Sequence, residues 1–215
     1  MQSGDNIKVM FPLFQGEKGG AVPTSPLNYK VFKISKTEAV EYIKKNHYSK
    51  TCSPNPFPCY GLFDGYRLIG VLMFAVSVSE NVRASIFGKG NEGQMTELHR
   101  LHIMDCTPKN TESWFIGKCI KFLKKLNPQI KAIISFADPS EGHQGTIYKA
   151  TNFKFMGTTG KATFWRDKNG ILRHPRQKTH VDGKRVSYNI PAEEAKNRGW
   201  TKEVRQGKLR YIFYF

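Results

Sequence analysis

The amino-acid sequence predicts an α/β (α+β) protein, with a mixed, mostly antiparallel twisted sheet flanked by helices and a basic C-terminal extension. Three observations predict this fold class. Strand-like and helix-like patterns follow one another in the order β-α-β-β-β-α-β-α-β. Of the 215 residues 39% are hydrophobic, and the 15 Phe and 9 Tyr are enough to build a core. The net charge is +17, and most of it lies toward the C-terminus.

The N-terminal region changes from a polar stretch to a strand and a helix. Residues 1–27 are rich in Gly and Pro, and we expect a flexible arm there. Residues 29–34 (YKVFKI) alternate apolar and polar side chains like a half-buried strand. In 35–49, Ser35 is a candidate N-cap and Glu38 follows three residues later, which is the capping box that starts a helix.

The next segments predict a hairpin and a further strand. Residues 58–63 and 68–78 flank the turn DGYR, and the second of them is too apolar for a sheet edge. We expect 84–93 (ASIFGKGNEG) to form a loop. Alternation in 95–103 (MTELHRLHI) predicts one more strand. The hairpin makes this part of the predicted sheet antiparallel.

The second half of the chain alternates helices with strands. Residues 110–126 are amphipathic, with lysines on the outer side of the expected helix. The apolar run that ends 129–138 (QIKAIISFAD) predicts a buried strand. A short helix over 142–150 and a strand pair or bent strand over 153–167 (FKFMGTTGKATFWRD) complete the pattern.

The charge distribution indicates a polyanionic partner. Residues 1–142 hold 18 Lys and Arg against 12 Asp and Glu, whereas residues 143–215 hold 16 against 5. Because cations that neutralise phosphates dominate the binding of nucleic acids, the C-terminal third is the part expected to face them.

Cysteine spacing and hydropathy exclude several other classes of protein. No CxxC pair occurs, so we expect packing cysteines in a reducing, intracellular setting and no common zinc module. No signal peptide opens the chain, and no apolar run approaches the ~18 residues that cross a bilayer, so we expect no membrane role. The four cysteines are Cys52, Cys59, Cys106 and Cys119.

The order of elements resembles the GNAT acyltransferase fold over roughly residues 28–166. That resemblance implies a cleft between two splayed parallel strands, and a helix whose N-terminus points at the diphosphate of a cofactor. It divides the chain into an arm (1–27), a GNAT-like catalytic domain (28–166) and a basic extension (167–215) that packs on the same domain. Segment 105–118 (DCTPKNTESWFIGK) departs from the family's Gly-rich phosphate loop, which argues against ordinary acetyl-CoA use.

Four pieces are similar to the Mom family of phage DNA-modification proteins, a divergent GNAT branch. They are HYS (47–49), ELHRL (97–101), SFADPSEGHQGTIYKATNF (135–153) and the basic, Tyr-rich ending KLRYIFYF (208–215). The resemblance implies a transferase that converts adenine N6 in duplex DNA to a carbamoylmethyl or related acyl or glycyl-derived adenine. It also implies protection of phage DNA from restriction in the host cytoplasm. Iron is linked to the family, and the donor stays open between an acyl-CoA and a glycine-derived or aminoacyl-tRNA species.

Three candidate site residues follow two predicted elements. His47 and Tyr48 fall where a helix is expected to end, so both can turn toward a cleft; alternatively, His47 caps the helix as a cation and Tyr48 packs. Asp138 closes a buried strand, where it could bind a metal, accept the N6 proton, or only stabilise the corner as an Asx-turn. The donors of His47, Tyr48 and Asp138 suit non-haem iron better than zinc, or the three act as acid and base groups.

Further candidates come from the strand 95–103 and from the corner after Asp138. Tyr148 occupies the position of the GNAT tyrosine that protonates the departing thiolate, so it could protonate a leaving group, ligate a metal or contact the base; alternatively, it is a core tyrosine. Arg100 either pairs with Glu97 or another acid, or holds an anionic or carbonyl part of the donor. His143 and Ser140 are alternative proton carriers or turn residues.

An adenine in a duplex must be flipped out to reach a cleft. Trp165, Phe164 and Tyr60 are candidates to stack on the flipped base, or they pack in the core. The basic segment 173–185 is expected to lie along the phosphates, unless it is a solvated loop. Its cations are Arg173, Arg176, Lys178, Lys184 and Arg185.

Two other functions fit the sequence less well. The first is a GNAT-type N-acetyltransferase that acts on another amine, which the missing phosphate loop disfavours. The second is a non-catalytic nucleic-acid-binding protein, in which the grouping of His47, Asp138 and Tyr148 is a coincidence. We therefore expect a transferase whose partner is double-stranded DNA.

Overall fold

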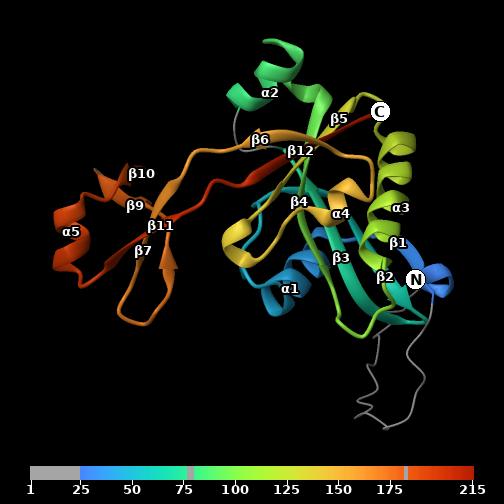
Figure 1. Ribbon diagram of the computed structural model, residues 1–215, viewed down its shortest axis with the longest axis horizontal. Coiled ribbons are helices and arrows are strands. Elements are labelled where there is room, and N and C mark those ends of the chain that lie inside the picture. The colour runs from blue at the N-terminus through green and yellow to red at the C-terminus, as the bar shows by residue number, and fades with distance from the viewer. Residues whose placement is uncertain (1–24, 77–79, 182–183) are drawn as a thin grey trace, which may run out of the picture.

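A computed structural model describes residues 25–76, 80–181 and 184–215 of the chain. Its centre is a seven-stranded sheet in the order β1-β2-β3-β4-β5-β12-β6 (Figure 1). Every neighbouring pair is antiparallel except β4 and β5, which run parallel. The mixed, mostly antiparallel sheet that the sequence predicts is therefore confirmed. The strands are β1 (Lys30–Ile34), β2 (Pro56–Asp64), β3 (Arg67–Ala75), β4 (Met95–Ile103), β5 (Ala132–Ala137), β6 (Lys154–Thr158) and β12 (Leu209–Tyr214).

Helices cover both faces of this sheet because its strands alternate their side chains. On β5, Ile133 packs in the cluster that contains the apolar side of α3 (Thr111–Leu126), whereas Ile134 packs in the cluster that α2 (Glu80–Phe87) covers. On β3, Met73 likewise faces α1 (Lys36–Asn46), opposite to α3. The short α4 (Thr146–Lys149) lies on the α3 side, and three 3₁₀ turns cover Pro26–Asn28, Glu92–Gln94 and Pro139–Glu141.

Local sequence signals predict several of these elements well. The N–H of Glu38 donates a hydrogen bond to Ser35 Oγ (3.1 Å), so the predicted N-cap of α1 is confirmed. Strand β4 covers the predicted range 95–103. Residues 1–24 of the expected arm lie outside the described residues, and within those residues no helix is long and apolar enough to cross a bilayer.

The predicted loop over 84–93 is wrong in its first half. Helix α2 runs through Phe87, because Val82, Ile86 and Phe87 pack against the sheet cluster of Met95, Ala132, Ile134 and Ile212. This burial supplies the stability that the short segment lacks by itself. The chain leaves the helix at Gly88, whose φ of 82° is one that glycine adopts without strain.

The strands of the predicted pair over 153–167 both form, but they do not pair with each other. β6 pairs with β12 in the central sheet, whereas β7 (Ala162–Arg166) pairs with β11 (Thr201–Arg205) and β8 (Leu172–Arg173) in a separate small sheet. The chain therefore leaves the central sheet after β6 and returns to it only at β12. We call residues 162–205 the outlying unit.

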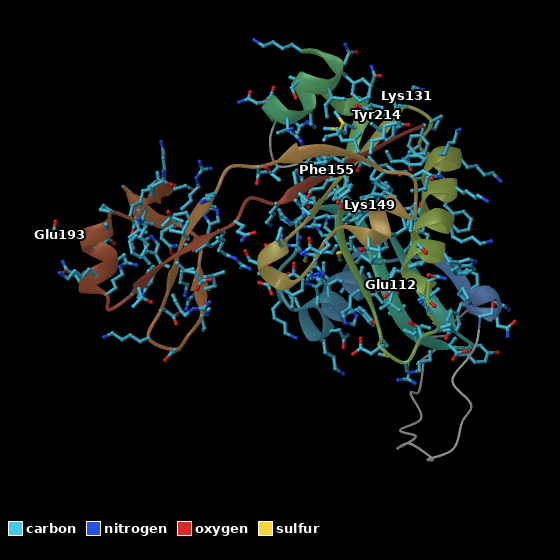
Figure 2. The ribbon with its side chains drawn as sticks, in the orientation of Figure 1. Glu112, Lys131, Lys149, Phe155, Glu193 and Tyr214 are labelled. Carbon is cyan, nitrogen blue, oxygen red and sulfur yellow. The ribbon has the colours of Figure 1, made fainter. Side chains whose placement is uncertain are left out.

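The outlying unit stands to one side of the central sheet, where Figure 2 shows Glu193 near its far end. It also contains the hairpin of β9 (Arg176–Val181) and β10 (Lys184–Asn189) and the helix α5 (Ala192–Asn197). Its own core is small: of its described residues, Trp165, Ile190 and Ala195 form the buried cluster. The predicted extension 167–215 is thus divided between this unit and β12.

The cysteines are free thiols in the structure. Cys59 and Cys119 are buried in apolar clusters and Cys52 is half-buried against one of them, as expected for packing residues. Cys106 differs from that expectation because it is exposed.

Candidate active site

A cavity of about 350 Å³ opens where the two parallel strands separate. β4 and β5 pair only over Met95–Glu97 and Ala132–Ile134, and beyond this pairing they diverge. The rest of β4 lines one side of the cavity and the segment 136–138 lines the other. The sheet therefore builds the cleft itself, at the carboxyl end of a parallel pair.

The cavity brings together all five residues predicted to be catalytic. They come from four separate places: the end of α1, the middle of β4, the corner after β5, and α4. His143 also lines the cavity, whereas Ser140 is exposed and donates its N–H to Asp138 Oδ1 (3.0 Å). The five residues are His47, Tyr48, Arg100, Asp138 and Tyr148.

His47 is a buried, neutral histidine. It is the C-cap of α1, and its Nδ1 accepts a hydrogen bond from the Ser49 N–H (3.1 Å), which assigns the ring proton to Nε2. Burial lowers the pKa of His47 to about 4, with the nearby cation of Arg100 acting in the same direction. The alternative that His47 caps the helix as a cation therefore does not hold at neutral pH.

Tyr48 forms an aromatic edge of the cavity. Its ring lies 4.3 Å from the His47 ring and 5.6 Å from the His143 ring, measured between centroids. Its side chain is 54% exposed, so it does not pack in a core. Partial burial of the side chain and the charge of Asp138 raise its pKa. Tyr48 offers a flat surface at the mouth on which a base could stack.

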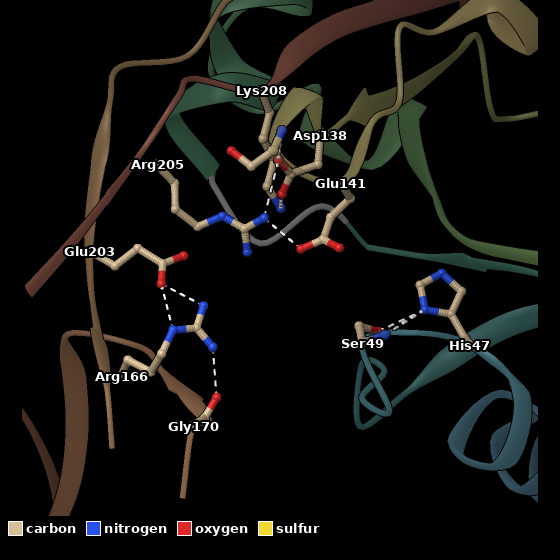
Figure 3. Close-up of polar contacts among 10 residues, drawn as sticks. His47, Ser49, Asp138, Glu141, Arg166, Gly170, Glu203, Arg205 and Lys208 are labelled. Atoms are coloured by element: carbon tan, nitrogen blue, oxygen red, sulfur yellow. Dashed lines mark hydrogen bonds and ion pairs between the residues drawn. The ribbon is translucent and has the colours of Figure 1, made fainter. Parts of the chain in front are cut away.

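The Asp138 carboxylate both stabilises the corner after β5 and lines the cavity. Its Oδ1 accepts the Ser140 N–H and caps the 3₁₀ turn Pro139–Glu141. Two cations face the same carboxylate, because Arg205 Nη2 lies 3.8 Å from Oδ1 and Lys208 Nζ lies 3.9 Å from Oδ2 (Figure 3). Asp138 thus lines the cavity as a charge-balanced carboxylate.

Tyr148 is nearly buried and keeps its proton. It packs between Phe153 and Tyr211, with centroid distances of 5.5 and 5.3 Å. Burial raises its pKa to about 12, more than a hydrogen bond with Ser135 lowers it. A phenol with this pKa keeps its proton at neutral pH and can donate a hydrogen bond.

Arg100 does not pair with Glu97. Its Nε donates to the Thr51 carbonyl (2.8 Å) and its Nη1 to the His99 carbonyl (2.7 Å). The guanidinium therefore fastens the loop that follows Tyr48 onto β4.

The sequence-based prediction missed a hydrogen-bonded pair of side chains on β4. Glu97 Oε1 lies 3.2 Å from His99 Nδ1, and both residues line the cavity. His99 Nε2 accepts the Ser53 N–H (2.8 Å), so Nδ1 carries the ring proton that is donated to Glu97. The spacing of two residues in ELHRL, which puts both side chains on one face of a strand, could have revealed this pair.

The metal prediction is not supported by the donors around the cavity. Within 25–76, 80–181 and 184–215, no three His, Cys, Asp or Glu side chains come together as ligands. Asp138, the carboxylate of the proposed set, already faces Arg205 and Lys208, which disfavours a further cation there. Iron stays a prediction from the family resemblance, and no step below uses it.

The three aromatic residues proposed to stack on a base lie elsewhere. Tyr60 is 1% exposed in the core beneath α3, and Trp165 is buried in the outlying unit. Phe164 lies on β7, with its ring 5.5 Å from that of His174. That prediction is wrong for this cavity: Tyr60 packs in the core of the central sheet, and Trp165 and Phe164 lie on opposite faces of β7 in the outlying unit.

The predicted phosphate-binding cations belong to the outlying unit. Arg176 and Lys184 are exposed on the β9–β10 hairpin. Arg173 is held by Asp167, with its Nη2 2.7 Å from Oδ2, so part of its charge is compensated. The side chains of Lys178 and Arg185 lie outside the described residues.

Comparison with known proteins gives one family and one fold. A family model described as the Mom protein family matches residues 28–215. The chain is 35% identical to the methylcarbamoylase Mom of Escherichia phage Mu over 124 residues, a stretch that covers 57% of this chain. That stretch spans about half (51%) of the length of this curated relative.

Solved structures of acetyltransferases resemble the fold at low sequence identity. A variant of the spermidine N-acetyltransferase SpeG from Vibrio cholerae matches with a TM-score of 0.50 and 8% identity, over 87% of this chain and 94% of that one. A candidate acetyltransferase from Acinetobacter baylyi matches with a TM-score of 0.50 and 9% identity, over 87% and 93%. The predicted GNAT acyltransferase fold is therefore confirmed.

Proposed function

Because this chain belongs to the Mom protein family, we propose that it is a phage transferase that modifies adenine in double-stranded DNA. The group transferred to N6 is a carbamoylmethyl group or a related acyl or glycyl-derived group. This modification protects the DNA from restriction in the host cytoplasm. One observation carries the proposal: five residues predicted from separate parts of the sequence line one cavity at the separated strands.

Protonation states support a division of labour in the cavity. The Asp138 carboxylate accepts the N6 proton as the amine attacks the donor, and the Tyr148 phenol, with a pKa of about 12, protonates the leaving group. His47 is neutral and donates a hydrogen bond through Nε2–H. Arg100 holds the loop over the site rather than contacting the donor, since its guanidinium already bonds two carbonyls.

The site needs an unpaired base, and two features suit one. The cavity of about 350 Å³ lies within the size range of small-molecule sites, so it would take a flipped adenine but no duplex. Tyr48 would stack on that base at the mouth. The exposed cations Arg176 and Lys184 would hold phosphates of the same duplex.

The donor side of the cavity favours a donor other than acetyl-CoA. Asn110, the N-cap of α3, makes no side-chain capping bond, and Glu112 in the first turn lines the cavity. A carboxylate at this helix end repels a diphosphate. This supports a glycine-derived or aminoacyl-tRNA donor over an acyl-CoA, and weak binding of acetyl-CoA in a calorimetric assay would agree with it.

The test is nucleoside mass spectrometry of plasmid DNA from cells that express the chain. We expect a modified deoxyadenosine heavier by about 57 Da, the formula difference for a carbamoylmethyl group in place of one hydrogen on a flipped base. The matched control is the Asp138→Asn variant, which keeps an acceptor for the Ser140 N–H. Unmodified adenine beside soluble, DNA-binding wild-type protein would favour the non-catalytic alternative.

A further inference from the structure

Two short connections join the outlying unit to the central sheet. They are residues 159–161, between β6 and β7, and residues 206–208, between β11 and β12; together we call them the neck. The Thr159 N–H donates to the Lys208 carbonyl (2.9 Å), and the Lys208 N–H donates to Thr159 Oγ1 (2.8 Å). A Cβ on Gly207 would lie 1.8 Å from the Thr159 carbonyl oxygen, so only glycine allows this approach. The two connections are therefore fastened side by side.

Arg205, at the end of β11, ties the outlying unit to the corner that carries Asp138. Its Nη2 lies 2.5 Å from Glu141 Oε1 and 3.8 Å from Asp138 Oδ1 (Figure 3). On its other side, the guanidinium lies 6.0 Å from the centroid of the Phe164 ring of β7. Arg205 thus fills the space between the small sheet and the 3₁₀ turn Pro139–Glu141.

This contact differs from the other ion pairs of the outlying unit. The Arg205 side chain is only 13% exposed, whereas Arg166, which pairs with Glu203 within the unit, is 44% exposed. Glu141 and Glu203 are equally exposed (32%), so the difference lies in the arginine: water screens the less exposed Arg205 charge less, and its contact with Glu141 is the stronger constraint. Together with the longer Arg205–Asp138 contact, it joins the outlying unit to the 3₁₀ turn that follows β5.

We propose that Arg205 is a positioning residue: through Glu141 it fixes the outlying unit relative to the cavity. A duplex held by that unit then presents its flipped base at the cavity in one orientation. This second statement rests on the proposed function, whereas the first concerns the protein alone. A small rotation at the neck would become a large displacement at the β9–β10 hairpin, because the hairpin stands far from the neck (Figure 1).

The first readout measures the orientation of the outlying unit without DNA. Spin labels on native Cys106 and on a Glu193→Cys substitution in α5, in a Cys52→Ser background, report one distance by double electron–electron resonance; Cys59 and Cys119 are buried. We expect a narrow distribution for the parent and a broader one for both Arg205→Ala and Glu141→Ala. The matched control Arg166→Ala also removes an arginine ion pair, but within the unit, and should leave the distribution narrow. Unchanged distributions in both test variants would overturn the proposal.

The second readout is the yield of modified deoxyadenosine in plasmid DNA. Since a displacement of about 1 Å at a reacting centre can cost 10²-fold, we expect Arg205→Ala and Glu141→Ala each to lower the yield by ~10-fold or more. The double variant should be no worse than Arg205→Ala, because Arg205→Ala already removes the ion pair with Glu141. Arg166→Ala should keep the yield, and Arg205→Lys, which retains a cation for Glu141, should lie between wild type and Arg205→Ala.

The signs of the charge changes separate positioning from simple attraction to DNA. Arg205→Ala lowers the net charge by one and Glu141→Ala raises it by one, so an effect through DNA attraction would move the two yields in opposite directions. Opposite directions would overturn the proposal, and a fall in both supports it. If wild-type DNA carried no modification at all, the proposed function would fail, and the distance distributions would still decide the role of Arg205.

Discussion

Buried side chains determine the chemistry of the central sheet's cavity, whereas the outlying unit has a small core and exposed ion pairs. Around the cavity, burial sets the chemistry: it lowers the pKa of His47 to about 4 and raises the pKa of Tyr148 to about 12. In the outlying unit the core consists of Trp165, Ile190 and Ala195, and exposed ion pairs such as Arg166–Glu203 cover the surface. Substitutions near the cavity should therefore change proton transfer and its pH dependence. Substitutions on the outlying unit should change binding and its dependence on salt.

The largest effect is expected at the proton-transfer groups of the cavity. Tyr148→Phe and Asp138→Asn should each lower the yield of modified deoxyadenosine by ~10²–10⁴-fold, the usual cost of losing a general acid or base. Both variants preserve the shape of the side chain. Thermal unfolding should therefore stay close to wild type, and duplex binding in a gel-shift assay should persist.

A matched control lies in the same aromatic cluster. Tyr211 packs 5.3 Å from the Tyr148 ring, and its hydroxyl donates to the Gln144 carbonyl (3.1 Å) without lining the cavity. Tyr211→Phe should cost about 1 kcal/mol of stability, because it removes this hydrogen bond, and leave the yield in place. Equal falls in yield in Tyr148→Phe and Tyr211→Phe would mean that the cluster matters for packing and that Tyr148 transfers no proton.

The second effect is a pH dependence of stability that belongs to the cavity. The folded pKa of His47 is about 4, below its ordinary value of 6.5, so the unfolded chain takes up a proton first as the pH falls. The stabilisation is complete above pH 6.5 and is lost between that value and about pH 4. From the linkage relation this amounts to about 3 kcal/mol.

Denaturant unfolding at pH 7 and pH 4.5 would measure this contribution. In His47→Asn the amide oxygen can accept the Ser49 N–H but does not titrate, so we expect a smaller loss of stability on acidification than in wild type. Identical losses in the two proteins would contradict a buried, neutral His47. They would also mean that burial around the cavity does not shift pKa values, which is the property that distinguishes it from the outlying unit.

The parts of the fold that the sequence predicts are those with local causes. The N-cap at Ser35, the alternation of β4 and the amphipathic α3 each follow from neighbours in the chain, and all three form as expected. Helix α2 was missed because its stability comes from packing on the sheet, through Ile86 among others. Strand β12 was missed because its position between β5 and β6 depends on a distant part of the chain.

The same division applies to the candidate site. Resemblance to a family pointed to residues that the structure brings to one cavity, although they lie as far apart in sequence as His47 and Tyr148. Glu97 and His99 carried a local signal in the strand. Arg205 and Lys208 carried none, because they reach Asp138 only through the path that the chain takes out of the central sheet and back toward it.

The smallest effect is expected on the outlying unit, where exposed cations would bind phosphates. Replacing Arg176 and Lys184 by Gln should weaken duplex binding similarly for any sequence. The slope of log affinity against log salt should become shallower by up to about 0.9 for each phosphate that the protein no longer neutralises. The identity of the modified base should not change, because phosphate-binding side chains position the duplex and do no chemistry.

The matched control replaces Lys121 and Lys125, on the exposed side of α3, by Gln, which removes the same amount of charge from a helix on the central sheet. If this control weakened binding and flattened the salt slope more than the hairpin variant, the duplex would run along α3. The outlying unit would then have another role.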